Sequence, residues 1–500
     1  MSWGLRPDLP VYLLIASLIV SPLPDLIGHR GKPNRLPQAF LVVVSLSDLL
    51  LSSAVFALGP GSPWPFAIFY GQPGLGTCLL VDRASLFLAS TALLIALSAS
   101  IFVLGQPSLP HGYCVAFTAL MAGMVGVLSA GDLLTFYVFW EIMCLAAYAL
   151  VAMGERPEEA LEAAWKYFIM GSAGAVVMLF GISILYGLAG TLNMIFLARR
   201  LLGARDPWLL MALVLFIGGA GVEAAFVPLH TWLPDAYSEA PTPVSATIAG
   251  ITTEIGFFGL LKVVFVVFRS CSRTWQAILA AVCVANMFLG NLCALVQMDV
   301  KRFLAYPSIS IIGYATAALV VSGDPGLSEG ALAAVLFLIL SHGISKALAF
   351  LGAGPLASAV GSRDLRELGA AKTSFPVTAV LFVLAFLCRA GLPGTCGFVE
   401  KLALLPPLFS SPAYWWLGII MVINVIIAAA AYFRGVLNVI RTQGRPNGCR
   451  SERKAELAAM LILSALIIFL GIWPYPALRV AELGAKDLSS LGRYIEALGR

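Results

Sequence analysis

The chain has 500 residues, of which 60% are hydrophobic and only 11% are charged. Soluble domains carry roughly 25% charged residues, so this composition excludes a soluble globule and indicates a polytopic membrane protein. The formal net charge of +5 is small for this length and lies mainly in loops, which excludes a basic nucleic-acid-binding surface. We therefore expect the chain to contact the lipid bilayer and no nucleic acid.

Apolar windows of about 20 residues, the length of helix that crosses a bilayer, predict an all-α fold with about fourteen transmembrane helices. The first eight windows lie near residues 10–27, 37–58, 83–105, 112–130, 132–153, 166–190, 207–232 and 242–268. The other six lie near residues 274–297, 301–321, 330–353, 374–406, 412–440 and 455–476. The first window is followed by prolines and a basic loop without a small-residue cleavage site, so we expect a span there and not a signal peptide.

Basic residues predict the orientation of the chain. The loops after odd-numbered spans hold Arg30, Lys32, Arg35, Arg156, Lys301, Arg302, Arg363, Arg366, Lys372, Arg441, Arg445, Arg450, Arg453 and Lys454. The positive-inside rule puts these loops in the cytoplasm and both termini outside, with a prokaryotic cytoplasmic membrane as the expected location. Arg199, Arg200 and Arg205 lie on the opposite side, and a short amphipathic segment in the headgroup layer would account for them.

Six ionisable residues lie inside apolar, membrane-length segments: Glu141, Glu223, Glu254, His342, Lys346 and Lys401. Burying a charge at bilayer depth costs at least ~2.5–3.5 kcal/mol, so such groups are kept mainly where they face water, a partner or a moving ion. The pattern predicts a protein that moves protons or small cations. The plainer alternative for each carboxylate is a structural hydrogen bond to a neighbouring helix, and Lys262, near the end of its span, is expected to reach the interface.

Two spans carry helix-breaking residues at corresponding places. The seventh holds Pro228 and Pro234, and the twelfth holds Gly391, Pro393 and Gly394. Broken backbone at membrane depth is tolerated only where it is buried in protein or lines a polar cavity. The pair suggests two inverted five-helix repeats, with simple proline kinks as the alternative. We therefore divide the chain into residues 1–110 (three helices), 111–270 (first repeat), 271–440 (second repeat) and 441–500 (last helix and tail).

Several motifs occur in order along the chain. They are Trp140-Glu141, Pro-Leu-His-Thr-Trp-Leu-Pro-Asp-Ala at 228–236 with Glu-Ala-Pro-Thr-Pro at 239–243, Asp-Val-Lys-Arg-Phe-Leu-Ala-Tyr at 299–306 with Gly313-Tyr314, His-Gly-Ile-Ser-Lys at 342–346, and Gly-Leu-Pro-Gly at 391–394 with Gly397-Phe398. Taken together, they resemble the antiporter-like subunits of respiratory complex I. The same family includes Mrp-type cation/proton antiporter subunits and the membrane arms of energy-converting hydrogenases.

The resemblance implies roles for four of the ionisable residues. Glu141 matches a glutamate that pairs with a lysine on the broken seventh span. His342 and Lys346 match a histidine and a lysine that relay protons along the middle of the membrane. Lys401 matches the terminal ionisable group of the second half-channel.

Three further residues are expected to support the pathway. His230 belongs to the motif after the first break, and Asp235 is expected to hold that loop. Glu400 and Lys401 are consecutive and point roughly 100° apart on a helix, so only Lys401 need face the channel. Arg389, just before the second break, could neutralise Glu400.

The chain departs from the family pattern in its first half. Glu223 occupies the position where the family usually has a lysine, and Glu254 replaces the usual lysine or histidine of the eighth span. If Glu141 and Glu223 are close, burial and repulsion predict that they share a proton and titrate as a pair. Alternatively, the carboxylates with Thr252 and Thr253 could hold a sodium ion, or the first half could be inactive. We favour protons, because the second half keeps residues that relay protons and repel cations.

These observations leave two classes of function. The leading one is a proton-pumping subunit without cofactor or metal of its own, working beside homologous antiporter-like and other membrane subunits of a redox complex. The alternative is a subunit of an Mrp-type sodium/proton antiporter without redox chemistry. An organic-solute carrier is disfavoured, because the ionisable residues are strung across many helices. The nine cysteines are scattered without the spacing of zinc or iron–sulfur ligands, and we interpret them as packing residues.

Overall fold

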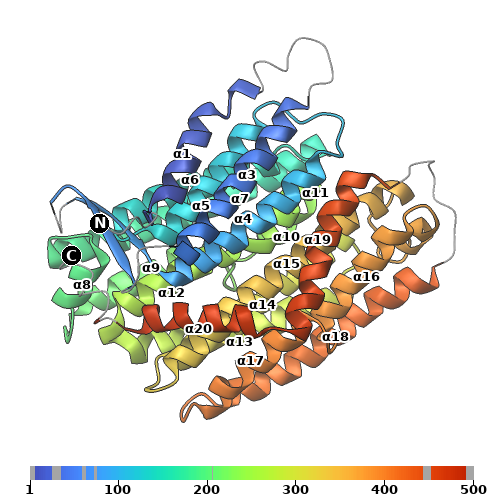
Figure 1. Ribbon diagram of the computed structural model, residues 1–500. Helices are drawn as coiled ribbons and strands as arrows, with labels where there is room; N and C mark the ends of the chain where they lie inside the picture. The colour runs from blue at the N-terminus through green and yellow to red at the C-terminus, as the bar shows by residue number, and fades with distance from the viewer. Residues whose placement is uncertain are drawn as a thin grey trace.

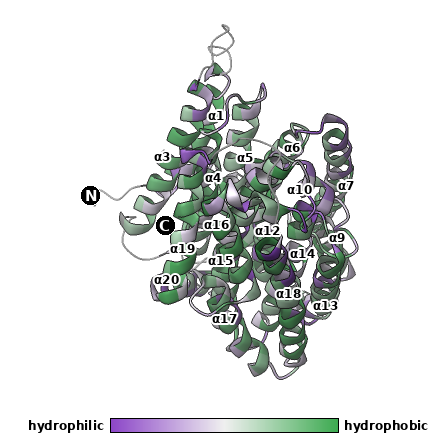
Figure 2. Ribbon diagram, turned by 90° about the vertical axis from the view of Figure 1, so that its right-hand side faces the viewer, coloured by the Kyte–Doolittle hydropathy of each residue, from purple (hydrophilic) through white to green (hydrophobic). Residues whose placement is uncertain are grey.

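The computed structural model describes residues 6–24, 35–58, 64–72, 76–204, 206–442, 452–490 and 492. The basic residues Arg30, Lys32, Arg205, Arg445 and Arg450 lie outside the described residues. The fold is a bundle of helices that are hydrophobic along most of their length (Figures 1 and 2). The protein is thus an integral, polytopic membrane protein of the predicted class.

Ten segments of the described chain are long and apolar enough to cross a membrane. They are α3 (Leu36–Leu58), α4 (Arg83–Val103), α6 (Leu133–Val151), α7 (Pro157–Ala189), α11 to α12 (Thr242–Val266), α13 (Ser272–Val296), α14 (Val300–Ser322), α15 (Ser328–Val360), α18 (Trp416–Arg441) and α19 (Lys454–Ile472). Four shorter apolar helices are α1 (Leu9–Val20), α5 (Tyr113–Ser129), α9 (Pro207–Glu223) and α16 (Pro376–Ala390). The number of crossings stays a prediction.

Several shorter elements complete the chain. They are α8 (Met194–Arg200), α10 (Leu233–Glu239), α17 (Cys396–Ser410), α20 (Tyr475–Ser489) and the 3₁₀ turns η2 (Arg269–Cys271) and η3 (Leu368–Thr373). Helix α8 is amphipathic, as expected for the segment between the sixth and seventh spans, since its apolar residues are buried and Arg199 and Arg200 are exposed. Helix α20 packs across α4 and α15 (Figure 1), where Arg83 donates to Asp487 at 2.5 and 2.7 Å.

The all-α fold is confirmed, with one short β-hairpin that the sequence analysis did not predict. Strands β1 (Phe66–Tyr70) and β2 (Thr77–Val81) form an antiparallel hairpin in which Phe66 pairs with Val81. The backbone of Gly131 donates to Cys78 at 2.8 Å, so the hairpin lies against the turn between α5 and α6. Windows of 20 residues do not detect five-residue strands, which explains the miss.

The two halves carry matching features. Helices α7 and α15 each have 33 residues and each end at a glycine with positive φ, Gly190 and Gly361. Asp132 caps the N-terminus of α6 and Asp299 caps that of α14. Each of these aspartates also forms a single β-bridge to a residue beyond the long helix, Asn193 or Asp364. The inverted repeat and the four-part division stay predictions, but these features follow the same order in both halves.

Candidate functional site

The first predicted break is confirmed. Helix α9 ends at Glu223, Ala225 has φ +52°, and the chain turns through Pro228 before α10 begins. Asn286 of α13 accepts a hydrogen bond from the amide of Val227 at 2.8 Å and donates to the carbonyl of Ala225 at 3.1 Å. Because backbone groups inside a membrane must find partners, this neutral side chain replaces helical hydrogen bonds lost at the break.

Glu223 is 2% exposed and meets donors that carry no positive charge. The hydroxyl of Tyr167 donates to Oε1 at 2.6 Å, and Sγ of Cys144 lies 3.5 Å from Oε2. The ring of Tyr167 stacks on Trp232 with centroids 3.8 Å apart, which fixes its hydroxyl. The structure therefore holds the Glu223 carboxyl among donors, with no lysine or arginine bonded to it among the described residues.

Glu141 lies on α6, half-buried, with the hydroxyl of Tyr137 bonded to its carboxylate one turn earlier. Glu141 lies within electrostatic range of Glu223. No hydrogen bond joins them in the described part of the chain, and a shared proton stays a prediction. Gly256 of α12 packs on this cluster, since a Cβ there would lie 2.9 Å from Cγ of Glu223.

Glu254 and His342 form the centre of the site. Nε2 of His342 lies 3.1 Å from Oε1 of Glu254, and the two residues are 0% and 1% exposed. The contact has ion-pair distance without the alignment of a good hydrogen bond, and neither Glu254 oxygen has another well-aligned partner among the described residues. Gly250 and Gly343 make this approach possible, because a Cβ on Gly343 would lie 2.6 Å from the carbonyl oxygen of Gly250.

A π-helix, η1 (Ile248–Thr252), comes directly before Glu254. Such bulges are rare and occur often at functional sites. The hydroxyls proposed as sodium ligands point elsewhere: Thr253 bonds the hydroxyl of Tyr237 at 2.6 Å, and Thr252 donates to the sulfur of Met124 at 3.6 Å. Within the described residues, no three His, Cys, Asp or Glu side chains converge as a metal site.

Lys346 is a third ionisable residue beside Glu254 and His342, one turn beyond His342 on α15. It is fully buried in α15, and its ammonium contacts the carbonyl of Leu304 and lies 5.9 Å from the ring centre of Phe350. Lys346 is within electrostatic range of Glu254, which it attracts, and of Arg389, which it repels. Lys346 therefore lies between the charges of the central pair and those of the second broken helix.

The second predicted break is also confirmed. Helix α16 ends at Ala390, Gly391 and Gly394 have φ +89° and +87°, and α17 starts at Cys396. Only glycine adopts such angles at little cost. The sulfur atoms of Cys388, on α16, and Cys396, on α17, lie 3.7 Å apart across this break. The break therefore brings the two helix ends into contact.

Glu400 lies between two cations. Oε1 accepts from Nη1 of Arg389 at 2.9 Å and lies 3.3 Å from Nζ of Lys401. Lys401 also donates to the carbonyl oxygens of Arg389 at 3.2 Å and Gly397 at 2.9 Å. The expected neutralisation of Glu400 by Arg389 is confirmed. The expectation that Glu400 and Lys401 point apart is wrong, because the flexible lysine stem returns to the broken backbone.

Comparisons with known proteins agree with this geometry. Residues 130–428 match the family model described as NADH:quinone oxidoreductase/Mrp antiporter, TM. The chain belongs to this family. It is 31% identical to NADH-quinone oxidoreductase subunit N of Desulforudis audaxviator, covering 93% of this chain and 94% of that one. It is 29% identical to F(420)H(2) dehydrogenase subunit N of Methanosarcina mazei, covering 95% and 96%.

Solved structures of the family share the fold over nearly the whole chain. A chain of the archaeal membrane-bound sulfane sulfur reductase matches with a TM-score of 0.87 at 25% identity, covering 98% of this chain and 99% of that one. A chain of the Mrp complex from Dietzia sp. DQ12-45-1b matches with a TM-score of 0.88 at 22% identity, with the same coverage. The antiporter-like fold predicted from the motifs is therefore confirmed.

The supporting residues hold the first break to its neighbours. Asp235 accepts from Lys166 of α7 and Arg302 of α14, both at 2.9 Å, so it joins three elements. His230 is half-buried after the break, and its Nδ1 has no described partner. The role of Asp235 in the loop has structural support, and the family role of His230 stays a prediction.

Lys262 is the clearest sequence-based error. It does not reach the interface: it is 1% exposed and donates to the carbonyl of Leu128 at 2.9 Å, with Asp82 at 3.7 Å. The carbonyl of Leu80, in the unexpected β-hairpin, lies 3.3 Å from the same ammonium. The hairpin covers this end of α12, which is why a lysine near a helix end is buried.

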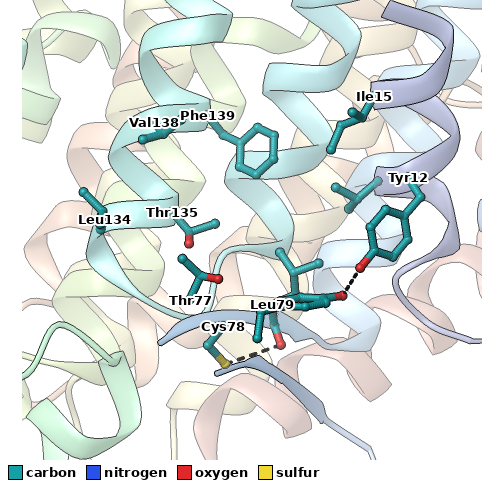
Figure 3. A pocket seen from close by; sticks show the side chains of 11 residues that line it. Tyr12, Ile15, Thr77, Cys78, Leu79, Leu134, Thr135, Val138 and Phe139 are labelled. Atoms are coloured by element: carbon teal, nitrogen blue, oxygen red, sulfur yellow. Dashed lines mark hydrogen bonds between the residues drawn. The ribbon is translucent and has the colours of Figure 1, made fainter. Parts of the chain in front are cut away.

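The described part of the chain contains polar cavities and an apolar groove in different places. Two polar cavities of about 380 and 500 Å³ share Glu155, Thr242, Gly354 and Ser358. Lys301 lines the larger one and is buried, donating to the carbonyl of Ala240 at 2.7 Å, which corrects its assignment to a loop. A separate apolar groove of about 400 Å³ lies between α1, the hairpin and α6 (Figure 3).

Proposed function

We propose that the chain is a proton-translocating, antiporter-like membrane subunit of a redox-driven complex. The observation that carries the proposal is a row of buried or half-buried ionisable groups in the bundle, with the contact between Glu254 and His342 at its centre. The row consists of Glu141, Glu223, Glu254, His342, Lys346, Arg389, Glu400 and Lys401. Electrostatic neighbours along the membrane plane are what lateral proton transfer requires.

Glu254 and His342 can exchange a proton directly with each other, without an intermediate group. Once the two side chains align, a protonated Glu254 delivers its proton to Nε2 of His342, which lies 3.1 Å away, and the reverse transfer restores it. Lys346, one turn away, makes a charged imidazole less favourable when it is itself an ammonium. The pair thus responds to the protonation state of its neighbour, and the response continues to Arg389 and the Glu400 cluster.

The acidic first half works as a loading site in this scheme. Protonation removes the charge of Glu223, and the hydroxyl of Tyr167 bonds either form by rotating its hydrogen. The polar cavities beside Lys301 and Arg363 provide access from one end of the bundle. We assign that end to the cytoplasm of a prokaryotic cell, with the chain in the cytoplasmic membrane and both termini outside, because several predicted cytoplasmic basic residues gather there.

The relatives favour a redox complex over a simple antiporter. Both whole-length relatives above are named as subunit N of a dehydrogenase or oxidoreductase, so we propose that other subunits hold the redox cofactors, that this chain holds none, and that homologous membrane subunits lie beside it. The alternative is a subunit of an Mrp-type sodium/proton antiporter. The Mrp neighbour supports it by fold alone.

The test is ion flux into proteoliposomes of the purified assembly, driven by its redox substrate or an imposed gradient, with sodium varied. Glu223→Gln and Glu254→Gln are compared with Glu162→Gln, which removes an exposed carboxylate of α7. Loss of proton flux without sodium dependence in the first two variants supports the proposal. Loss of a sodium-dependent flux selects the antiporter alternative, and unchanged flux in both variants contradicts the acidic row as a route.

A further inference from the structure

Helix α3 carries a buried carboxyl group outside the row. Its residues Gln38, Leu41, Ser45, Asp48 and Ser52 are all at most 1% exposed and recur every three or four positions, so they form one inward face. Neither carboxyl oxygen of Asp48 has a hydrogen-bond partner among the described residues, and the hydroxyl of Ser52, one turn later, has none either. An aspartate in a membrane-length helix therefore points inward without the partner that an ionised carboxylate needs.

The helices around α3 supply no counter-ion. Helices α1, α4 and α5 pack against it, and their only charged residue is Arg83. Arg83 begins α4 and is paired with Asp487. The other titratable groups on these helices are Tyr12, which bonds Tyr70, and Tyr113 and Cys114 at the start of α5. An ionised Asp48 would thus be a buried charge with no cation beside it among the described residues, which is unfavourable inside a membrane.

Two contacts fix the position of Asp48 between α3 and α4, which lie side by side in Figure 1. Ser45 lies 3.2 Å from Ser100 near the end of α4, whereas Val55 packs with Leu86 near its start. The two helices therefore run antiparallel, and Asp48 lies on the inward face of α3 between these two contacts.

We propose that Asp48 is a proton-binding site outside the antiporter-like repeats. Its carboxyl holds a proton at rest and exchanges it during turnover. One turn earlier, Ser45 lies 3.2 Å from Ser100, and such hydroxyls can both donate and accept. A neutral carboxylic acid needs no counter-ion, and its O–H carries the proton that is exchanged.

Helix α4 packs against α3 on one side and against α15 and η1, which flank the central pair, on the other. Ile95 of α4 packs on Gly250 and Gly343, the two glycines beside Glu254 and His342. An effect of Asp48 on turnover is therefore expected to pass through α4.

Infrared difference spectroscopy on the full assembly tests the site directly. The difference between wild type and Asp48→Asn is expected to contain the carbonyl stretch of a protonated carboxylic acid at neutral pH. That band is expected to shift in heavy water under an imposed proton gradient. Asp364→Asn is the matched control, because Asp364 is ionised in a loop ion pair with Arg366 and its loss removes no such band. Asp48→Glu is expected to restore the band.

A flux arm rests on the proposed function. Asp48→Asn is expected to lower gradient-driven proton flux several-fold, while Asp48→Glu and Asp364→Asn keep it. If the wild-type assembly moves no protons, the proposed function fails, but the infrared arm still decides whether Asp48 holds an exchangeable proton. The absence of the acid band, a band that does not shift in heavy water, or wild-type flux in Asp48→Asn overturns the proposal.

Discussion

The two broken helices solve the same backbone problem with opposite electrostatics. At the first break, neutral Asn286 bonds the backbone groups of Ala225 and Val227 that have lost their helical partners. Among the described residues, Glu223 is bonded to a hydroxyl and a thiol. At the second, cationic Lys401 bonds the exposed carbonyls and joins Arg389 around Glu400.

The difference shows that one backbone geometry accommodates two electrostatic surroundings. A carboxyl without a cation, such as that of Glu223 among the described residues, is stabilised inside a membrane by taking up a proton. Glu400 is instead paired with Arg389 and lies beside Lys401. In the proposed function, Lys401 is the group of the second break that releases a proton.

The sharpest test of this comparison removes one carboxylate at a time. Glu400→Gln leaves Arg389 buried without its counter-ion, and removing one partner of a buried pair costs about 3–5 kcal/mol. Glu223→Gln replaces a carboxyl that has no described cation beside it by a neutral amide of similar size, and should change stability by less than about 1 kcal/mol. Thermal unfolding of both variants in detergent measures the contrast, and equal losses would remove it.

Pumping should depend on the terminal lysine. Lys401→Ala is expected to lower proton flux by about 100-fold, the scale of one lost acid–base group, while the complex still assembles. Flux in proteoliposomes, with assembly checked by size-exclusion chromatography, measures it. Lys372→Ala is the control, since that lysine is bonded to the carbonyl of Ile440 outside the row. Normal pumping by Lys401→Ala would take the residue out of the pathway.

Asn286 is expected to stabilise the backbone of the first break without taking part in proton transfer. Asn286→Leu leaves the backbone groups of Ala225 and Val227 unpaired, which costs about 1–3 kcal/mol. Flux per folded complex should change less than in Glu223→Gln. A matched loss of flux at unchanged stability would show that Asn286 acts in transfer and not in support.

The smallest expected effect concerns pH. Burial alone would raise the pKa of Glu239, but Arg363, Ser238 and Arg156 outweigh it and hold the pKa below its ordinary value. A carboxyl whose pKa is lowered by folding stabilises the folded protein at pH values above its ordinary pKa near 4.5. That stabilisation is lost as the pH falls below this value. Because Arg156 is half-exposed, the loss should be about 1 kcal/mol or less. Melting temperatures at pH 7 and pH 4 should differ less in Glu239→Gln than in wild type.

Local sequence rules predicted what depends on residue type along one segment. Pro228 and Gly391 marked both breaks, and the ionisable residues of the row were visible because charges are rare in apolar windows. Contacts between segments were not predictable: whether Lys401 turns toward Glu400, or Lys262 toward the hairpin, depends on packing between helices far apart in sequence.

Some missed residues did carry a signal. Tyr167 and Asn286 are polar residues in apolar spans, and buried polar groups are normally hydrogen-bonded. Asp48 met the same criterion as the six ionisable residues and lies outside the segment that the family motifs cover. What the sequence could not show is that Asp48 is buried with no cation beside it among the described residues. That property depends on how α1, α4 and α5 pack against α3.

The central claim, that the row transfers protons as one unit, is tested most directly by a double-mutant cycle on Glu254 and His342. Flux is measured in proteoliposomes for Glu254→Gln, His342→Gln and the double variant, with Glu162→Gln as control. If the pair acts together, each single variant loses about as much flux as the double. Losses that simply multiply, or a single variant with wild-type flux, would contradict transfer through this contact.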